Sequence, residues 1–179
     1  NLEDADLTGA LLDDASARGA NFENATLCDA SLLRVGLDGC NFENADLEGA
    51  NLEGARAARS NFEHACMVRV RAYGAVLARS NLEKCELDEA ELSHADLSGA
   101  NLERCALPGA RLVAAVLAGA NVERADLSGA DLTDADLREA NVERCDVDGA
   151  CLDGAKLEGA NLEGMRGALR SRRDGGPFR

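Results

Sequence analysis

The sequence lacks the bulky side chains that usually fill a globular core. Its 179 residues include no Trp, one Tyr and four Phe, together with only two Pro. Leu and Ala therefore supply most of the apolar mass, although the length suffices for one domain. Ordinary close packing around large aromatic side chains is excluded, and a narrow, regular core is favoured.

Positive charge is also scarce. The chain has 19 Lys and Arg against 33 Asp and Glu, which gives a net charge of −14. Such a chain is repelled by nucleic acid and by anionic membranes, so we expect no direct binding to either. No apolar run approaches the length needed to span a membrane. Three explanations of the excess of acidic residues stay open: they bind a basic partner, they imitate an acidic polymer, or they simply keep the protein soluble.

The cysteines form no recognisable framework. There are seven, an odd number, and the sequence shows no signal-peptide pattern. This pattern predicts free thiols in a reducing compartment, the cytoplasm. The chain begins at Asn1 in the middle of a repeat, which predicts that an upstream segment has been removed. By position, Cys85, Cys105 and Cys145 should point inward, whereas Cys28, Cys66 and Cys151 should point outward.

Catalytic and metal-binding patterns are missing as well. His64 and His94 are the only histidines, and no Cys is placed to complete a metal site with them. The sequence contains no Gly-rich phosphate loop and no nucleophile paired with a base. Its carboxylates are regularly spaced, so no contrast of environments splits their pKa values. We therefore expect no enzyme activity, no cofactor and no metal.

What the sequence does contain is a strict five-residue period. The 33 positions 2, 7, 12 and onward to 162 hold 23 Leu, three Phe, three Val, three Ala and one Met. The 33 positions 5, 10, 15 and onward to 165 hold 24 Ala, four Cys, two Ser, two Val and one Met. A helix or a strand would bury positions at a period of 3.6 or two instead. Two inward positions in five indicate a chain that turns a corner every five residues.

A second period of twenty residues is superimposed on the first. The trio Asn, apolar, Glu begins at residues 1, 21, 41, 61, 81, 101, 121, 141 and 161. Four five-residue sides make one square coil of twenty residues, and about eight such coils fit the chain. Stacking at the spacing of paired strands, ~4.8 Å, predicts a rod roughly 40 Å long with parallel pairing between coils.

The stretches "ADLSGANLERC", "ADLSGADLTDADLREAN" and "ADLEGANLEGA" resemble pentapeptide repeat proteins, whose motif is A(D/N)LXX. The resemblance covers residues 1–165. It implies an all-β fold, a right-handed quadrilateral parallel β-helix. Residues 166–179 are expected to form a basic C-terminal tail, either a cap or a disordered segment.

One side of the predicted coil carries all nine Glu of the trios. The residue that follows the Glu is basic in four successive coils, at Lys84, Arg104, Arg124 and Arg144. No basic residue follows the Glu in the first three coils. Glu3, Glu23 and Glu43 therefore form an uncompensated acidic strip. The Asn column of the same trios should form a ladder of side-chain amides. The strip is either a solvated face or a surface that binds a basic groove.

A second region departs from the acidic pattern. Residues 66–79 read "CMVRVRAYGAVLAR", and residues 111–118 read "RLVAAVLA". Exposed apolar side chains together with Arg and Tyr are typical of protein interfaces, although tolerated drift in a robust solenoid gives the same pattern. The candidate interaction patch comprises Arg56, Arg59, Val68, Arg69, Arg71, Tyr73, Val76, Arg79, Val113 and Val116.

These features favour a non-catalytic protein-interaction scaffold, a rigid acidic rod that is the recognition arm of a larger protein. "CNFENADLEGANLEGA" followed by "CMVRVRAYGAVLARSNLEKC" resembles the C-terminal repeats of BTB/POZ adaptors of cullin ubiquitin ligases, which implies an adaptor role. The alternative is a DNA mimic that inhibits or protects DNA gyrase, as the resemblance to quinolone-resistance members implies. A third possibility is end-to-end stacking of rods, and the oligomeric state stays open.

Overall fold

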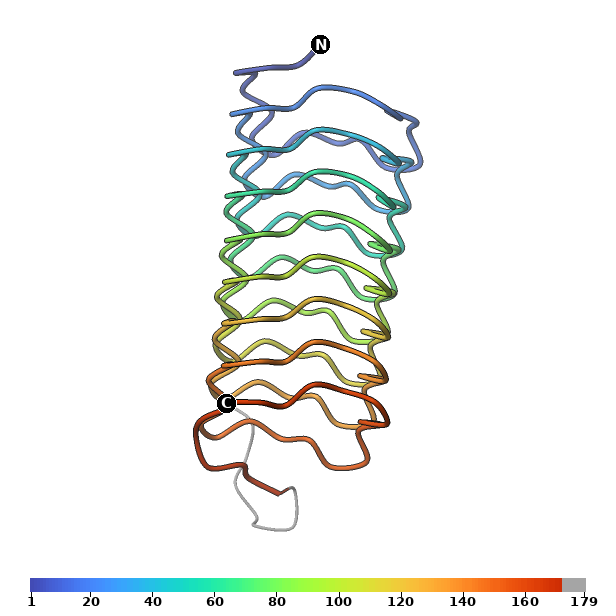
Figure 1. Cartoon of the computed structure of the whole chain (residues 1–179). Helices are drawn as coiled ribbons and strands as arrows, with labels where there is room; N and C mark the ends of the chain where they lie inside the picture. The colour runs from blue at the N-terminus through green and yellow to red at the C-terminus, as the bar shows by residue number, and fades with distance from the viewer. Residues whose placement is uncertain (172–179) are drawn as a thin grey trace.

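The computed structural model describes residues 1–171 and shows a rod of stacked coils (Figure 1). Each five-residue unit has one residue in a β-bridge, an inward centre, a two-residue turn and a second, small inward residue, and the pattern holds without slippage to residue 165. Residues 1–171 contain no helix, and their β-structure consists entirely of isolated parallel bridges. No helix in this part of the chain therefore has the length and apolar character to cross a membrane.

Four ladders of bridges run along the rod, one on each side. We name them by their bridging residues: side A includes Asn21 and Asn41, side B Thr26 and Asp46, side C Ser31 and Asn51, and side D Gly36 and Arg56. In each ladder the paired residues are twenty positions apart, except for the last pair of side C, Cys151 and Arg170. The predicted square coil of twenty residues is thus confirmed.

Adjacent coils are joined by backbone hydrogen bonds in a repeating set. On side A, Phe42 N donates to Asn61 O at 2.6 Å; at the corner between sides A and B, Asn44 N donates to Glu63 O at 3.0 Å, and Cys66 N of side B donates back to Ala45 O at 3.0 Å. Within the coil, Ala45 N donates to Phe42 O at 3.0 Å and closes the corner. The bonds satisfy the backbone as in a parallel sheet, so the coil can bury its interior without unpaired polar groups.

The interior is a continuous column of apolar side chains. Every centre from Phe22 to Val147 is at most 4 % exposed. The Phe rings stack directly, with centroids 4.6 Å apart between Phe22 and Phe42 and 4.9 Å apart between Phe42 and Phe62. Leu2 and Leu162, in the outermost coils, are 36 % and 37 % exposed. The inward assignment of the five-residue period is therefore correct.

The corners place residues in the left-handed backbone region. Nineteen non-glycine corner residues have φ between 54° and 60°, and most of them are charged or amide residues. Glycine removes the conformational cost at other corners: Gly74 has φ 63°, and an added Cβ there would meet nothing within 4 Å. Charged side chains at the remaining corners project away from the core.

After residue 165 the register changes by one residue. The last bridge joins Cys151 to Arg170, nineteen positions apart, and Arg170 Nη2 donates to Gly129 O at 3.1 Å. The Arg170 side chain thus reaches back two coils over side C. Cys151, predicted to point outward, is only 1 % exposed, and its sulfur lies 3.4 Å from Thr133 Oγ1. The side chain keeps its outward position beside the turn residue Thr133, but the returning chain covers the thiol. The rest of the expected tail, 172–179, lies outside the described residues.

Candidate interaction face

Most of the predicted patch gathers around side D. Two columns of turn residues border this side: the C–D turn, which includes Tyr73 and Gly74, and the D–A turn, which includes Ala78 and Arg79. Seven patch residues lie in the side D ladder or in these two turns, namely Arg56, Arg59, Tyr73, Val76, Arg79, Val113 and Val116. We call them the side D face.

The other three patch residues lie elsewhere on the rod. Arg71 belongs to the ladder of side C, where it pairs with Asn51 and Glu91. Val68 and Arg69 occupy the turn between sides B and C, so side C separates them from the side D face. Arg69 also forms an ion pair with Glu48. The structure therefore divides the predicted patch between different sides.

The side D face is flat and exposes apolar side chains. Arg56, Val76, Asp96 and Val116 follow one another along the ladder. Val116 is 37 % exposed, and Tyr73 at the C–D turn is 48 % exposed. Only alanine methyl groups, at Ala58 and Ala78, lie between the ladder and the arginines of the D–A turn in these coils. A partner backbone could approach this surface closely.

Arginine pairing distinguishes this region. Many arginines lie within 4.0 Å of a carboxylate oxygen, namely Arg18, Arg34, Arg56, Arg69, Arg104, Arg111, Arg124, Arg138 and Arg144. Among residues 1–171, Arg59, Arg71, Arg79 and Arg166 have no such partner, and three of these four belong to the predicted patch. All four are exposed. Arg59 and Arg79 occupy the same corner of successive coils, and two like charges one coil spacing apart, ~4.8 Å, repel by about 1 kcal/mol in water.

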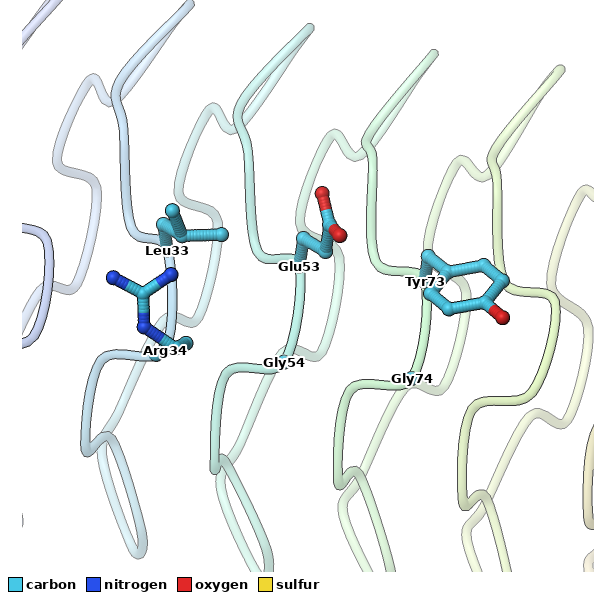
Figure 2. A pocket seen from close by; sticks show the side chains of 6 residues that line it. All are labelled: Leu33, Arg34, Glu53, Gly54, Tyr73 and Gly74. Carbon is cyan, nitrogen blue, oxygen red and sulfur yellow. The ribbon is translucent and has the colours of Figure 1, made fainter.

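A shallow hollow of about 290 Å³ lies at the C–D border (Figure 2). Leu33, Glu53 and Tyr73 project from successive coils, and Gly54 and Gly74 leave the adjacent corner positions without side chains. Tyr73 also lies against the His94 ring, with centroids 5.1 Å apart. Apart from the charged Arg34 and Glu53, the hollow is thus lined by the Leu33 side chain, an aromatic ring and backbone.

Charges at the rim of this hollow are only partly engaged. Arg34 donates to Asp14 through Nε at 2.8 Å and Nη2 at 2.6 Å, and these hydrogen bonds hold the pKa of the Asp14 carboxyl below its usual value. In the described part of the chain, Glu53 has no cation within 4.0 Å. The hollow is too open to isolate a reacting group from water, but it suits a side chain of a docked partner.

The acidic strip lies in the turn between sides A and B. Side A therefore separates it from the side D face. Asn21, Asn41 and Asn61 donate through Nδ2 to Glu3, Glu23 and Glu43 at 3.4, 3.3 and 3.4 Å. Within residues 1–171 no cation lies within 4.0 Å of these three carboxylates. From Lys84 onward the predicted ion pairs form, such as Lys84 with Glu83 at 2.9 Å. The strip is therefore uncompensated, as its spacing predicts.

The Asn ladder is also present. Each Asn donates to the Oδ1 atom of the preceding Asn at 3.0 to 3.1 Å from Asn41 to Asn161. That Oδ1 atom also accepts the backbone N–H of the Glu two residues later, for example Glu83 N at 3.2 Å. The amides thus stabilise both the stacking of coils and the turn after side A.

One cluster was missed by the sequence analysis. The carboxylate oxygens of Asp46 and Glu48 and the sulfur of Cys66, atoms that can ligate a metal ion, lie within 4.8 Å of one another beside side B. Burial and a hydrogen bond with Asp46 raise the pKa of the nearby Cys28 thiol to about 11. Residues 46 and 66 occupy the same position in successive coils, so the twenty-residue period was the signal that could have found them. Arg69 already pairs with Glu48, which neutralises part of this cluster.

Together, four parallel ladders, twenty-residue coils and an apolar centre in every unit define a quadrilateral β-helical solenoid. A profile of pentapeptide repeats matches eight copies, over residues 1–33, 37–71, 65–104, 95–134, 110–149 and 125–164. The chain belongs to the pentapeptide repeat family, and its coils form the right-handed quadrilateral β-helix of that family. This confirms the predicted fold class.

Two solved structures, of HetL and of a thylakoid-lumen protein, support the same conclusion. HetL, a pentapeptide repeat protein involved in heterocyst differentiation regulation in Nostoc sp. strain PCC 7120, is 32 % identical, with a TM-score of 0.52 over 90 % of this chain and 78 % of HetL. A pentapeptide repeat protein of the Arabidopsis thaliana thylakoid lumen is 27 % identical, with a TM-score of 0.51 over 56 % of this chain and 72 % of its own. QnrB1, a plasmid-mediated fluoroquinolone resistance protein, is 21 % identical, with a TM-score of 0.37 over 94 % and 87 % of the two chains. No curated protein matches the chain significantly.

Proposed function

We propose that the protein is a non-catalytic scaffold that binds another protein through the side D face. The observation that carries the proposal is the set of exposed arginines without carboxylate partners, Arg59 and Arg79, beside Tyr73 and Val76. Arg and Tyr are enriched among the residues that dominate binding energy at interfaces. A rigid rod presents such a face without the conformational cost of ordering a loop.

A structural role, rather than catalysis, agrees with the chemistry of the surface. The carboxylates recur at regular intervals, and the described hollow at the C–D border is shallow and open. The matched family is one of structural repeats. All seven cysteines are free thiols, which supports a reducing compartment such as the cytoplasm.

Comparative affinity capture tests this function. We would immobilise the parent chain, a face variant with Tyr73→Ala and Val76→Ser, and a control with Ala106→Ser and Pro108→Ala on side B. Lysate of the cells that produce the protein would be passed over each, and retained proteins would be quantified. We expect at least one protein to bind the parent and the control but not the face variant. Identical capture by all three chains would contradict the role of the side D face.

A second candidate function rests on the acidic strip. Glu3, Glu23 and Glu43 form a column of carboxylates without cation partners, a feature that a DNA mimic requires for a basic groove. A gyrase supercoiling assay would compare the parent with the variant Glu3→Gln, Glu23→Gln, Glu43→Gln. Inhibition by the parent alone would favour the DNA mimic. Absence of inhibition at tens of micromolar would remove this candidate.

A further inference from the structure

We propose that the D–A border of the side D face binds an acidic peptide segment of the partner, with Arg59 and Arg79 as its carboxylate receptors. The inference rests on the proposed function and adds the chemistry of the partner. It concerns the D–A border, whereas the hollow with Glu53 lies at the opposite, C–D border. The two borders of the face thus differ in charge, which gives a bound segment a defined position.

The backbone directs both arginines outward from one corner. Arg59 and Arg79 have φ values of 59° and 57°, so each occupies the same left-handed corner conformation. The corner positions before and after this pair are Gly39 and Gly99. A Cβ added at Gly39 would meet nothing within 4 Å, and one at Gly99 would meet only Arg79 Cγ, at 3.5 Å. A ligand can therefore reach the guanidinium groups from both directions along the rod.

Carboxylates match the donor geometry of this pair. Guanidinium presents a planar fork of donors that binds a carboxylate through two parallel hydrogen bonds. A carboxylate placed between Arg59 and Arg79 would also relieve their mutual repulsion. Asp38, the acidic residue of the same turn one coil earlier, is near Arg18 at 3.4 Å and Arg56 at 4.0 Å. It therefore does not supply the partner that Arg59 and Arg79 lack.

The surroundings favour a short peptide over nucleic acid. The neighbouring side A ladder is neutral here, with Asn61 and Asn81, and the D–A turn from Ala58 to Gly119 carries no acid. One carboxylate flanks the pair in each direction along the rod, Asp38, which lies near Arg18 and Arg56, and Asp96 of the side D ladder. Screening confines a surface charge to about 8 to 10 Å at physiological salt, so the more distant acidic coils contribute little to a peptide confined to this border. A DNA duplex would extend along the rod and meet its acidic coils, which repel phosphate.

The same border offers an apolar contact. Ala58, Ala78 and the half-buried Val76 lie between the arginine column and the centre of side D. An apolar side chain between two acidic residues of the partner would cover these groups. The geometry thus points to a segment in which Asp or Glu flanks a residue such as Leu.

Fluorescence anisotropy with three labelled probes tests the proposal. The probes are the peptide Glu-Asp-Leu-Glu-Asp, its amide counterpart Gln-Asn-Leu-Gln-Asn, and a DNA duplex of about 20 base pairs. We expect saturable binding of the acidic peptide by the parent chain, weakened when NaCl is raised from 50 to 300 mM, and no binding of the other probes. The variant Arg59→Gln, Arg79→Gln should bind at least tenfold more weakly. The control Arg104→Gln, Arg124→Gln should change binding less than twofold, because those arginines already pair with Glu.

Several outcomes would overturn the inference. The first is that the parent chain does not bind the acidic peptide at millimolar concentration. The second is that the Arg59→Gln, Arg79→Gln variant binds this peptide as tightly as the parent and has a parent-like melting temperature. The third is that the parent binds the DNA duplex more tightly than the acidic peptide. Affinity capture separates this failure from failure of the proposed function. A partner lost with Tyr73→Ala and Val76→Ser but retained with Arg59→Gln, Arg79→Gln would preserve the side D face and refute the acidic segment.

Discussion

Replacing Asn81 by Ala should destabilise the rod far more than the same change at Asn51. Asn81 stands within the amide ladder of side A. Its Nδ2 donates to Asn61 Oδ1 at 3.0 Å and to Glu63 Oε2 at 3.3 Å, and its Oδ1 accepts Glu83 N at 3.2 Å and Asn101 Nδ2 at 3.1 Å. Asn51, on side C, makes one such bond, accepting Glu53 N at 3.1 Å. Both residues occupy the bridging position of interior coils and are half-buried.

The magnitude follows from the difference in hydrogen bonds. Each contributes about 1 kcal/mol net, and partly exposed groups regain some of this from water. Asn81→Ala should therefore lower the free energy of unfolding by roughly 2 to 4 kcal/mol, and Asn51→Ala by about 1 kcal/mol. Other effects of placing Ala in a bridge are common to both variants, so the difference isolates the ladder.

Urea unfolding followed by far-UV circular dichroism would measure both values. Asn81→Asp supplies a second comparison, because it keeps the acceptor but replaces the donor with a carboxylate facing Glu63. We expect Asp at this position to cost at least as much as Ala. Equal losses for Asn81→Ala and Asn51→Ala would refute the idea that stacked amides act as a stabilising ladder.

Three further predictions follow from the core and the ion pairs. Leu97 is 0 % exposed, so Leu97→Asp should abolish the cooperative thermal transition, and a parent-like melting curve would contradict the inward packing of this residue. A hydrogen bond from Arg138 lowers the pKa of the Asp136 carboxyl to about 2. The stabilisation by this pair is therefore present above the usual carboxyl pKa and is lost as pH falls towards 2. Arg138→Ala should raise the pKa of Asp136 in an NMR titration. Burial raises the pKa of the Cys145 thiol to about 11, so DTNB at pH 8 should modify this cysteine slowly in the folded chain and rapidly in urea; rapid modification of folded Cys145 would show that the coil opens.

The interior could be predicted from the sequence because one simple period determines it. Once a corner occurs every five residues, each centre must point inward, and residues twenty apart must stack. Phe22, Phe42 and Phe62 stack in this way, with their rings parallel to within 2°. The ion pairs beside the amide ladder follow as well, since a basic residue comes immediately after each of the column residues Glu83, Glu103, Glu123 and Glu143.

The surface was harder to predict because chain neighbours lie on different sides. Val68 and Val76 are eight residues apart in sequence, but side C lies between them. Burial of Cys151 depends on a one-residue change of register before Arg170, which lies beyond the regular period. Ion pairing also varies in its spacing: Arg69 reaches a carboxylate 21 residues earlier, whereas Arg111 reaches one twenty residues earlier. Composition alone therefore did not reveal which arginines lack a partner.

That lack of partners is the strongest reason to look for function at the D–A border. The left-handed corner costs about 1 kcal/mol or more for any residue with a side chain, so folding gains nothing by replacing glycine with Arg59 or Arg79. On the turn after side A, Arg104 and Arg124 offset this cost by pairing with Glu83, Glu103 and Glu123. The D–A border has the same corner geometry without the compensating carboxylates. The proposed acidic segment would supply the carboxylates that these two adjacent charges lack.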